Sequence, residues 1–83
     1  MEYKLNISEK DFNDIYFGRK KFLVRNDNID FKIGDILILK EYENEKYTGN
    51  VMHRVITYIE NNNAYLKEDF LILGIAEISK LYT

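Results

Sequence analysis

The chain has 83 residues, a formal net charge of −2 and no cysteine. A chain of this length holds one compact domain, and a hydrophobic share of 46% with 14% aromatic residues can supply its core. The missing cysteines exclude disulfides, thiolate metal sites and thiol nucleophiles, and the acidic balance argues against a protein that coats DNA through an extended basic face. We therefore expect a single domain over residues 1–83.

The first part of the chain is predicted to form a strand, a short helix and a second strand. Residues 2–7 alternate polar and apolar, which is the period of a half-buried strand. Ser8 then precedes residues 9–17, whose apolar side chains have helical spacing, so we expect a helix with Ser8 as its N-cap. Gly18 is expected to end this helix, and strand character resumes over residues 21–25.

The middle of the chain is dominated by one strongly apolar segment. Turn-forming Asn and Asp residues occupy four of the five positions 26–30, and a second turn is expected at Ile33, Gly34 and Asp35. Residues 35–42 carry a run of branched side chains, which indicates a strand buried on both faces. A polar loop is expected over residues 43–49.

Two further strands are predicted in the last part of the chain. They cover residues 51–59 and 70–78, with a turn at residues 61–63 between them. Gly74 would mark a bulge or a barrel corner in the last strand. One helix and about five strands indicate an α+β fold, mostly β, built as a curled sheet or small barrel.

Dedicated metal, phosphate-loop and membrane sites are not expected. His53 is the sole histidine, so no metal site is predicted, and we interpret this residue as a partly buried structural side chain. The chain has neither a GxGxxG nor a Walker A motif, and its hydroxyl residues form no triad-like pattern. No apolar run approaches the length needed to cross a bilayer and no signal peptide is recognisable, so a cytoplasmic location without membrane contact is expected.

Residues 18–35 concentrate positive charge within an acidic chain. Basic and aromatic residues are interleaved there, and tyrosines follow later in the chain. Arginine offers a planar fork to phosphate and tyrosine can stack on a base, so the mixture suits a single-stranded nucleotide. The alternative is that most aromatic residues form the core and the cations are a solvated face. The cations are Arg19, Lys20, Lys21 and Arg25, and the aromatic residues expected in the core are Phe12, Phe22, Phe31 and Phe70.

Short motifs that follow one another in a fixed order resemble a known family. They comprise Gly18, Lys20 and Arg25; Asn26 and Asp27; Phe31, Ile33, Gly34 and Asp35; Leu39, Glu41 and Tyr42; and Tyr47, Thr48 and Gly49. In this order they resemble the ASCH domain family of the PUA-like superfamily, in particular its small stand-alone branch in bacteria and phages. The resemblance covers nearly the whole chain.

The resemblance implies a small β-barrel of about five or six strands with one short N-terminal helix and a cleft beside the helix exit. Lys20 and Arg25 would line this cleft, with Lys20 as a point charge for phosphate and Arg25 as a bidentate donor. Glu41 would orient a cationic partner, and a tyrosine would stack on a base. The ligand-binding residues implied in this way are Lys20, Arg25, Glu41, Tyr42, Tyr47 and Thr48.

Three positions depart from the family pattern. Leu23 replaces a glutamate of the G-x-K-x-x-E-x-R motif, where the amidohydrolase branch has a threonine, and an aliphatic side chain can neither shuttle a proton nor attack a carbonyl. Asn28 replaces an arginine, and Asn50 stands where a basic residue is common. These departures favour binding over catalysis.

The leading hypothesis is a non-catalytic module, without cofactor, that binds RNA or a small nucleotide or nucleoside. A second hypothesis is a nucleoside amidohydrolase or ribonuclease of the ASCH type, with Lys20 as base or electrophile. A third is a phage-type interaction protein that blocks a protein partner or sequesters a nucleotide signal. The sequence leaves the oligomeric state open.

Overall fold

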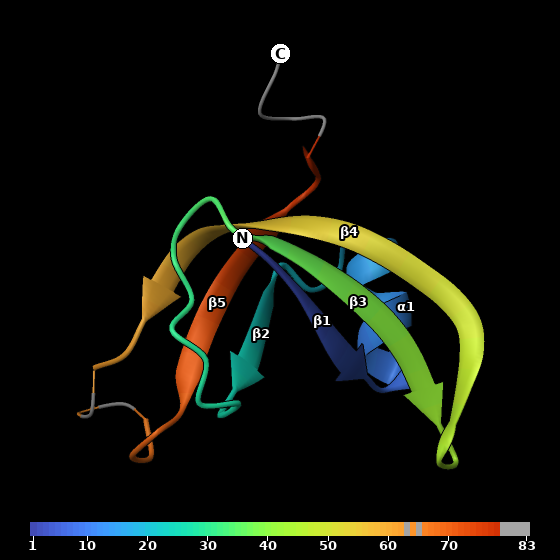
Figure 1. The fold of residues 1–83 in the computed structure, drawn as a ribbon, viewed down its shortest axis with the longest axis horizontal. Coiled ribbons are helices and arrows are strands. Elements are labelled where there is room, and N and C mark those ends of the chain that lie inside the picture. Colours follow the sequence, from blue (N-terminus) through green and yellow to red (C-terminus); the bar gives the residue numbers. More distant parts are fainter. Residues whose placement is uncertain (63, 65, 79–83) are drawn as a thin grey trace.

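The fold is a curved sheet with a short helix beside it (Figure 1). The computed structural model describes residues 1–62, 64 and 66–78. Within these residues, the strands form a five-stranded sheet in the order β1-β3-β4-β5-β2. The expected α+β, mostly β architecture is confirmed. The elements in chain order are β1 (Glu2–Ile7), α1 (Glu9–Tyr16), β2 (Phe22–Arg25), β3 (Ile36–Glu43), β4 (Lys46–Glu60) and β5 (Leu71–Ala76).

The sheet is not closed, unlike the barrel expected from the resemblance. β1 pairs with β3 in parallel, and the other neighbouring strands pair antiparallel. β1 and β2 lie at the two edges of the sheet, while β4 forms the top of the arch in Figure 1. No ladder of backbone hydrogen bonds joins β1 to β2 within the described part of the chain.

Helix α1 begins and ends where the sequence predicts. The Ser8 hydroxyl accepts a hydrogen bond from the Asp11 backbone N–H at 3.1 Å, which satisfies one of the free donors of the first turn. Phe12 and Ile15 are buried against the sheet. Gly18 follows the C-cap with φ +79°, a conformation that glycine adopts without a Cβ penalty. No helix in the described ranges is long and apolar enough to span a membrane.

β3 is buried on one face only, which corrects the expectation of burial on both faces. Leu37 and Leu39 are fully buried, whereas Ile36, Ile38 and Lys40 are partly exposed. The sheet is a single curved layer, so the core covers one face and solvent reaches the other. Branched residues on the outer face therefore reflect strand propensity rather than burial.

β3 and β4 form a tight hairpin where a polar loop was expected over residues 43–49. β3 continues to Glu43 and β4 begins at Lys46, so Asn44 and Glu45 alone make the turn. Both have positive φ, 52° and 63°, as in a type I′ turn. The polar composition of residues 43–49 suggested a loop, but both strands extend beyond the core, where their side chains are exposed and can be polar.

Gly74 lies opposite a β-bulge, as the sequence predicts. The register between β4 and β5 shifts between Ile56 and Tyr58, and Gly74 pairs with Tyr58. A Cβ at Gly74 would lie 3.0 Å from the Tyr58 Cβ, so the two strands approach closely there.

Two smaller expectations concern β4 and the turn that follows it. His53 on β4 is exposed rather than partly buried. Of the turn expected over residues 61–63, residue 63 lies outside the described residues.

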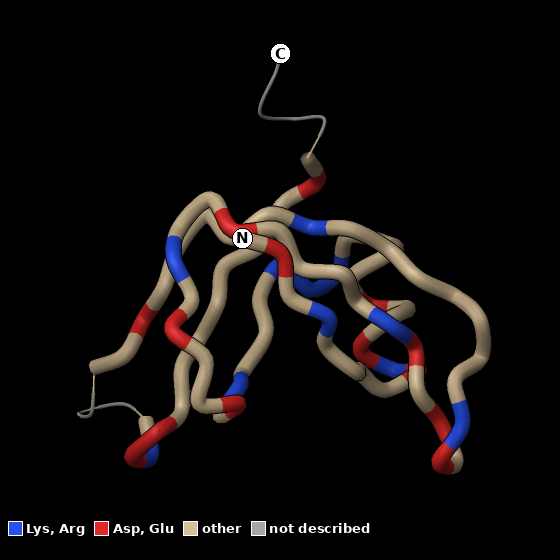
Figure 2. Tube along the Cα trace, viewed as in Figure 1, with Lys and Arg blue, Asp and Glu red and all other residues tan. Residues whose placement is uncertain are grey.

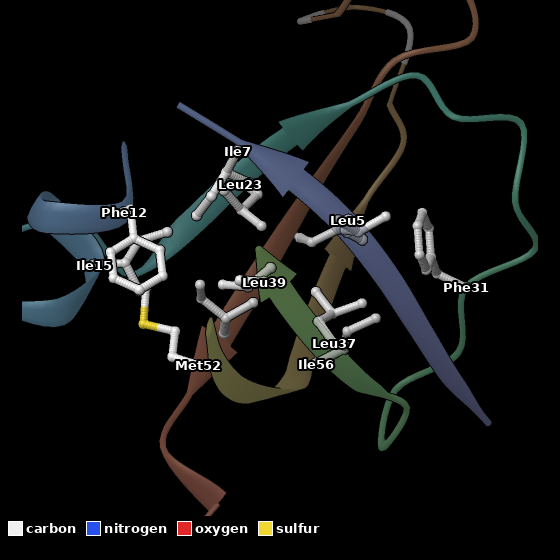
Figure 3. Close-up of a cluster of buried hydrophobic side chains, with 12 residues drawn as sticks. Leu5, Ile7, Phe12, Ile15, Leu23, Phe31, Leu37, Leu39, Met52 and Ile56 are labelled. Carbon is white, nitrogen blue, oxygen red and sulfur yellow. The ribbon is translucent and has the colours of Figure 1, made fainter. Parts of the chain in front are cut away.

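The core fills the concave side of the sheet (Figure 3). Leu23 on β2 is 2% exposed and Phe31 covers one end of the core, whereas Phe22 is 43% exposed. Phe22 was expected in the core, but it alternates with Leu23 along β2 and therefore faces the other way. Phe12 and Phe31 are buried as expected, and Phe70 is partly exposed.

Candidate functional site

A cavity of about 220 Å³ lies at the exit of α1. The end of the helix, the segment that follows it, β4 and β5 all contribute to its walls. Buried Ile15 and Ile75 give it an apolar base, and three cations stand around it. In Figure 2, segments with Lys and Arg follow the helix and cross β4 in this region. The cavity is lined by Ile15, Gly18, Lys20, Lys21, Arg54, Ile75, Ala76 and Glu77.

Lys20 is held in place by the turn that ends the helix and by a carboxylate. Its backbone N–H donates to the Asp14 carbonyl at 3.0 Å, and its Nζ donates to Asp11 Oδ1 at 2.9 Å. The Nζ also lies 5.2 Å from the centroid of the Phe22 ring, within the range of a cation–π contact. Lys20 therefore stands at the cavity in a fixed position, with part of its charge balanced by Asp11.

Arg54 is a site residue that the sequence reasoning missed. Its Nη1 donates to the His53 carbonyl at 2.8 Å, and no carboxylate of the described residues forms an ion pair with it. The same holds for Lys21, which is exposed. Strand alternation could have identified Arg54. It places Arg54 on the same face of β4 as Met52, and a cation on the core-facing side of a strand is unusual unless it has a partner or a function.

Arg25 lies at the opposite end of β2 from Lys20 and does not line this cavity. Its Nε and Nη2 donate to the two carboxylate oxygens of Asp27, each at 2.6 Å, and its Nη1 donates to the Asn6 carbonyl at 2.9 Å. Asn6 belongs to β1, so one side chain bridges the two edge strands. The Arg25 guanidinium holds the pKa of Asp27 below its usual value, against the opposing effect of partial burial.

The other four predicted site residues lie on the β3–β4 hairpin. Glu41 is 5% exposed on the core-facing side of β3. Its Oε1 accepts from the Thr48 hydroxyl at 2.5 Å and from the Asn50 side-chain amide at 3.0 Å. The Tyr42 and Tyr47 rings meet edge to face with their centroids 5.0 Å apart. Glu41, Thr48 and Asn50 thus form a hydrogen-bond network, with the buried Glu41 carboxylate as its acceptor, at the point where the β3–β4 register shifts.

The six predicted site residues therefore occupy three places rather than one cleft. Lys20 lies at the helix exit, Arg25 at the seam between the edge strands, and the remaining four on the hairpin. None of these arrangements resembles a metal centre: among the residues that the structure describes, no three His, Asp or Glu side chains gather to hold an ion.

A second, larger cavity has the opposite electrostatic character. It measures about 770 Å³ and lies between residues 26–31 and residues 69–71, with Asn61 at its margin. Asp27, Asp30 and Asp69 line it. Carboxylates disfavour a phosphate ligand, so the cavity at the helix exit is the better candidate for anion binding.

Comparison with known proteins defines the family but not its activity. Residues 2–75 match a family described as a domain of unknown function, DUF3850, and because this match spans most of the chain, the chain belongs to that family. A search among curated proteins finds no match.

Proposed function

We propose that the chain is a non-catalytic RNA- or nucleotide-binding domain, and that the cavity at the helix exit receives a phosphate group. The observation that supports this most directly is the convergence of Lys20, Lys21 and Arg54 on one small cavity from two segments that are distant in sequence, the helix exit and β4. Lysine supplies a compact charge and arginine a planar pair of donors, and both are common ligands of phosphate.

The size of the cavity favours one phosphate rather than a whole ligand. Sites that enclose a small molecule measure about 300–1,000 Å³, whereas this cavity measures about 220 Å³. The rest of the ligand would therefore lie outside it. Asp11 and Glu77 offset part of the positive charge. With about three phosphate-binding cations, the logarithm of the affinity for single strands should fall with the logarithm of salt concentration at a slope near −2.

Binding is favoured over catalysis by the position of Leu23 and by the lining of the cavity. Leu23 stands where the resembling family has its glutamate or threonine, and here it is part of the buried core. None of the described residues that line the cavity carries a hydroxyl or thiol nucleophile. Lys20, the proposed base of an amidohydrolase or ribonuclease, donates to Asp11 instead.

We also propose that the fold is of the PUA-like, ASCH type. Support comes from the strand–helix–strand start of the chain, the glycine that ends the helix directly before Lys20, and the strong curvature of the sheet. In this interpretation the barrel is completed at the seam between β1 and β2 by the Arg25 side chain, which reaches the Asn6 carbonyl. The hairpin residues Tyr42, Tyr47 and Thr48 would then lie at the far end of the sheet from the cavity.

The proposal is tested by the binding of a labelled short single-stranded RNA, followed by fluorescence anisotropy at low salt. Lys21→Ala and Arg54→Ala should each weaken binding by about ten- to a hundredfold, because each removes a charge-assisted contact of about 1.5–3 kcal/mol. Lys46→Ala, an exposed lysine on the hairpin, is the matched control and should leave the affinity unchanged. Lack of binding by the parent protein, or equal losses in Arg54→Ala and Lys46→Ala, would contradict the proposal.

A further inference from the structure

A groove of about 320 Å³ lies between α1 and β4, next to the cationic cavity. Its floor includes buried Phe12 and Met52, whose side chains point toward one another (Figure 3). Its lining differs from that of the cationic cavity because it carries no charged side chain among the described residues. The groove is lined by Phe12, Asn13, Tyr16, Phe17, Asn50, Val51 and Met52.

The groove and the cationic cavity lie next to each other, and both have walls from the α1 region and from β4. Met52 lines the groove and Arg54 lines the cavity, and both belong to β4. Alternate residues of a strand share a face and lie about 7 Å apart. On the helix side, Tyr16 lines the groove and its neighbour Ile15 lines the cavity. A ribose with its phosphate spans a comparable distance, so one nucleotide can occupy both parts.

Two aromatic rings at the groove are exposed although the core lies beside them. Tyr16 is 61% exposed and Phe17 is 64% exposed. They meet edge to face at 5.1 Å, and the Arg19 guanidinium lies 5.3 Å from the centroid of the Phe17 ring. Exposed rings next to cations are the usual combination in surfaces that bind single strands, because every base has a face that can stack.

Two amide side chains supply hydrogen-bonding groups at the same groove. Asn50 uses its amide nitrogen to donate to Glu41, so its position is fixed by a buried partner. The Asn13 side chain makes no hydrogen bond to any described residue. An amide carries both donors and acceptors and can therefore pair with the edge of a base.

We propose that this groove is the base subsite of the same ligand, so that the protein binds a nucleotide with an unpaired base. The phosphate would lie at Lys20, Lys21 and Arg54, the base would stack on Tyr16 or Phe17, and Asn13 would contact its edge. This inference rests on the proposed function. An apolar peptide would use the rings but leave the amides and the adjacent cations without partners, and a duplex would keep its bases stacked internally and out of reach. The ligand class is therefore single-stranded RNA or a free nucleotide.

The test compares two labelled oligonucleotides of equal length and charge, one with bases and one abasic, against the same protein. The parent should bind the oligonucleotide with bases about tenfold more tightly or better, which is the usual effect of stacking one base. Phe17→Leu and Tyr16→Leu keep an apolar side chain but remove a ring, and at least one of them should abolish this preference while abasic binding stays the same. Tyr58→Leu removes an exposed ring outside the groove and should preserve the preference.

The outcomes separate this inference from the proposed function. Equal affinity of the parent for the two oligonucleotides would overturn the base subsite but leave phosphate binding intact. A preference that survives in both Phe17→Leu and Tyr16→Leu would also overturn it. If the parent binds neither oligonucleotide, both proposals fail. Far-UV circular dichroism establishes that each variant is folded, and the abasic affinity of each leucine variant provides an independent check of its cationic cavity.

Discussion

Removal of the Arg25 side chain is expected to destabilise the fold at the seam between the two edge strands. Arg25 makes two hydrogen bonds to Asp27 at 2.6 Å and one to the Asn6 carbonyl at 2.9 Å. The side chains of Arg25 and Asp27 are each 21% exposed, so the pair lies between a surface pair and a buried one. We expect Arg25→Ala to lower the free energy of unfolding by about 1–2 kcal/mol. In a domain of this size, that corresponds to a fall in Tm of roughly 5–15 °C.

Urea unfolding followed by far-UV circular dichroism measures this effect. A double-mutant cycle with Arg25→Ala, Asp27→Ala and the double variant isolates the pairwise contribution, which we expect to be about 1 kcal/mol. Arg19→Ala is the control, because Arg19 pairs with Asp14 at 3.0 Å but is 60% exposed. That control should cost no more than about 0.5 kcal/mol.

Two results would refute this reasoning. One is a coupling energy near zero in the cycle, which would mean that the observed geometry contributes nothing to stability. The other is an equal loss in Arg25→Ala and Arg19→Ala. If the expectation holds, Arg25→Ala is a poor probe of ligand binding, because a loss of affinity could then result from the destabilised fold rather than from a lost ligand contact.

Three further predictions concern acid stability, the Glu41 network and the hairpin turn. The pKa of Asp27 is lowered in the fold, so its stabilising contribution is present above the unfolded value, about 3.9, and is lost as pH falls through the folded value. The Tm of Asp27→Asn should therefore fall less than that of the parent between pH 5 and pH 3; an identical fall would contradict this. Glu41→Ala should lower the free energy of urea unfolding by about 1 kcal/mol, because the hydrogen bonds from the Thr48 hydroxyl and the Asn50 amide are lost while both donors stay within reach of water. Glu41→Gln, which retains an acceptor, should cost less; equal losses would count against the network. Glu45→Gly should raise the free energy of unfolding by about 0.5–1 kcal/mol, because Glu45 has φ 63° and glycine adopts this left-handed conformation without a Cβ penalty. A lower urea midpoint for this variant would contradict the prediction.

The local elements were predictable because each has a local cause. The Ser8 cap and Gly18 bound α1 through backbone geometry that involves only neighbouring residues. The apolar pattern of residues 35–42 was sufficient to identify β3 but not to decide how many of its faces are covered. That depends on what packs against the strand, and in the described part of the chain no helix or strand forms a second layer on the other side of the sheet.

The grouping of the site residues was not predictable in the same way. Lys20 and Arg25 are close in sequence, but the strand between them carries their side chains to opposite ends of β2. Arg54 is distant in sequence from Lys20, yet both line one cavity because β4 and β5 pass beside the helix exit. Such proximity follows from strand order, and the order β1-β3-β4-β5-β2 has no local signal in the sequence.

The strand order also has a consequence for the sequence of events in folding. β3 and β4 are joined by a tight turn and can pair early, because closing a short loop costs little entropy. β2 pairs with β5, which lies far along the chain, so the segment that carries Lys20 and Lys21 has no strand partner until β5 docks. Ile75 and Ala76 of β5 also line the cationic cavity. The cavity is therefore expected to form last during folding. In the native protein, amide hydrogen exchange should show that the strands around the cavity open before the rest of the sheet.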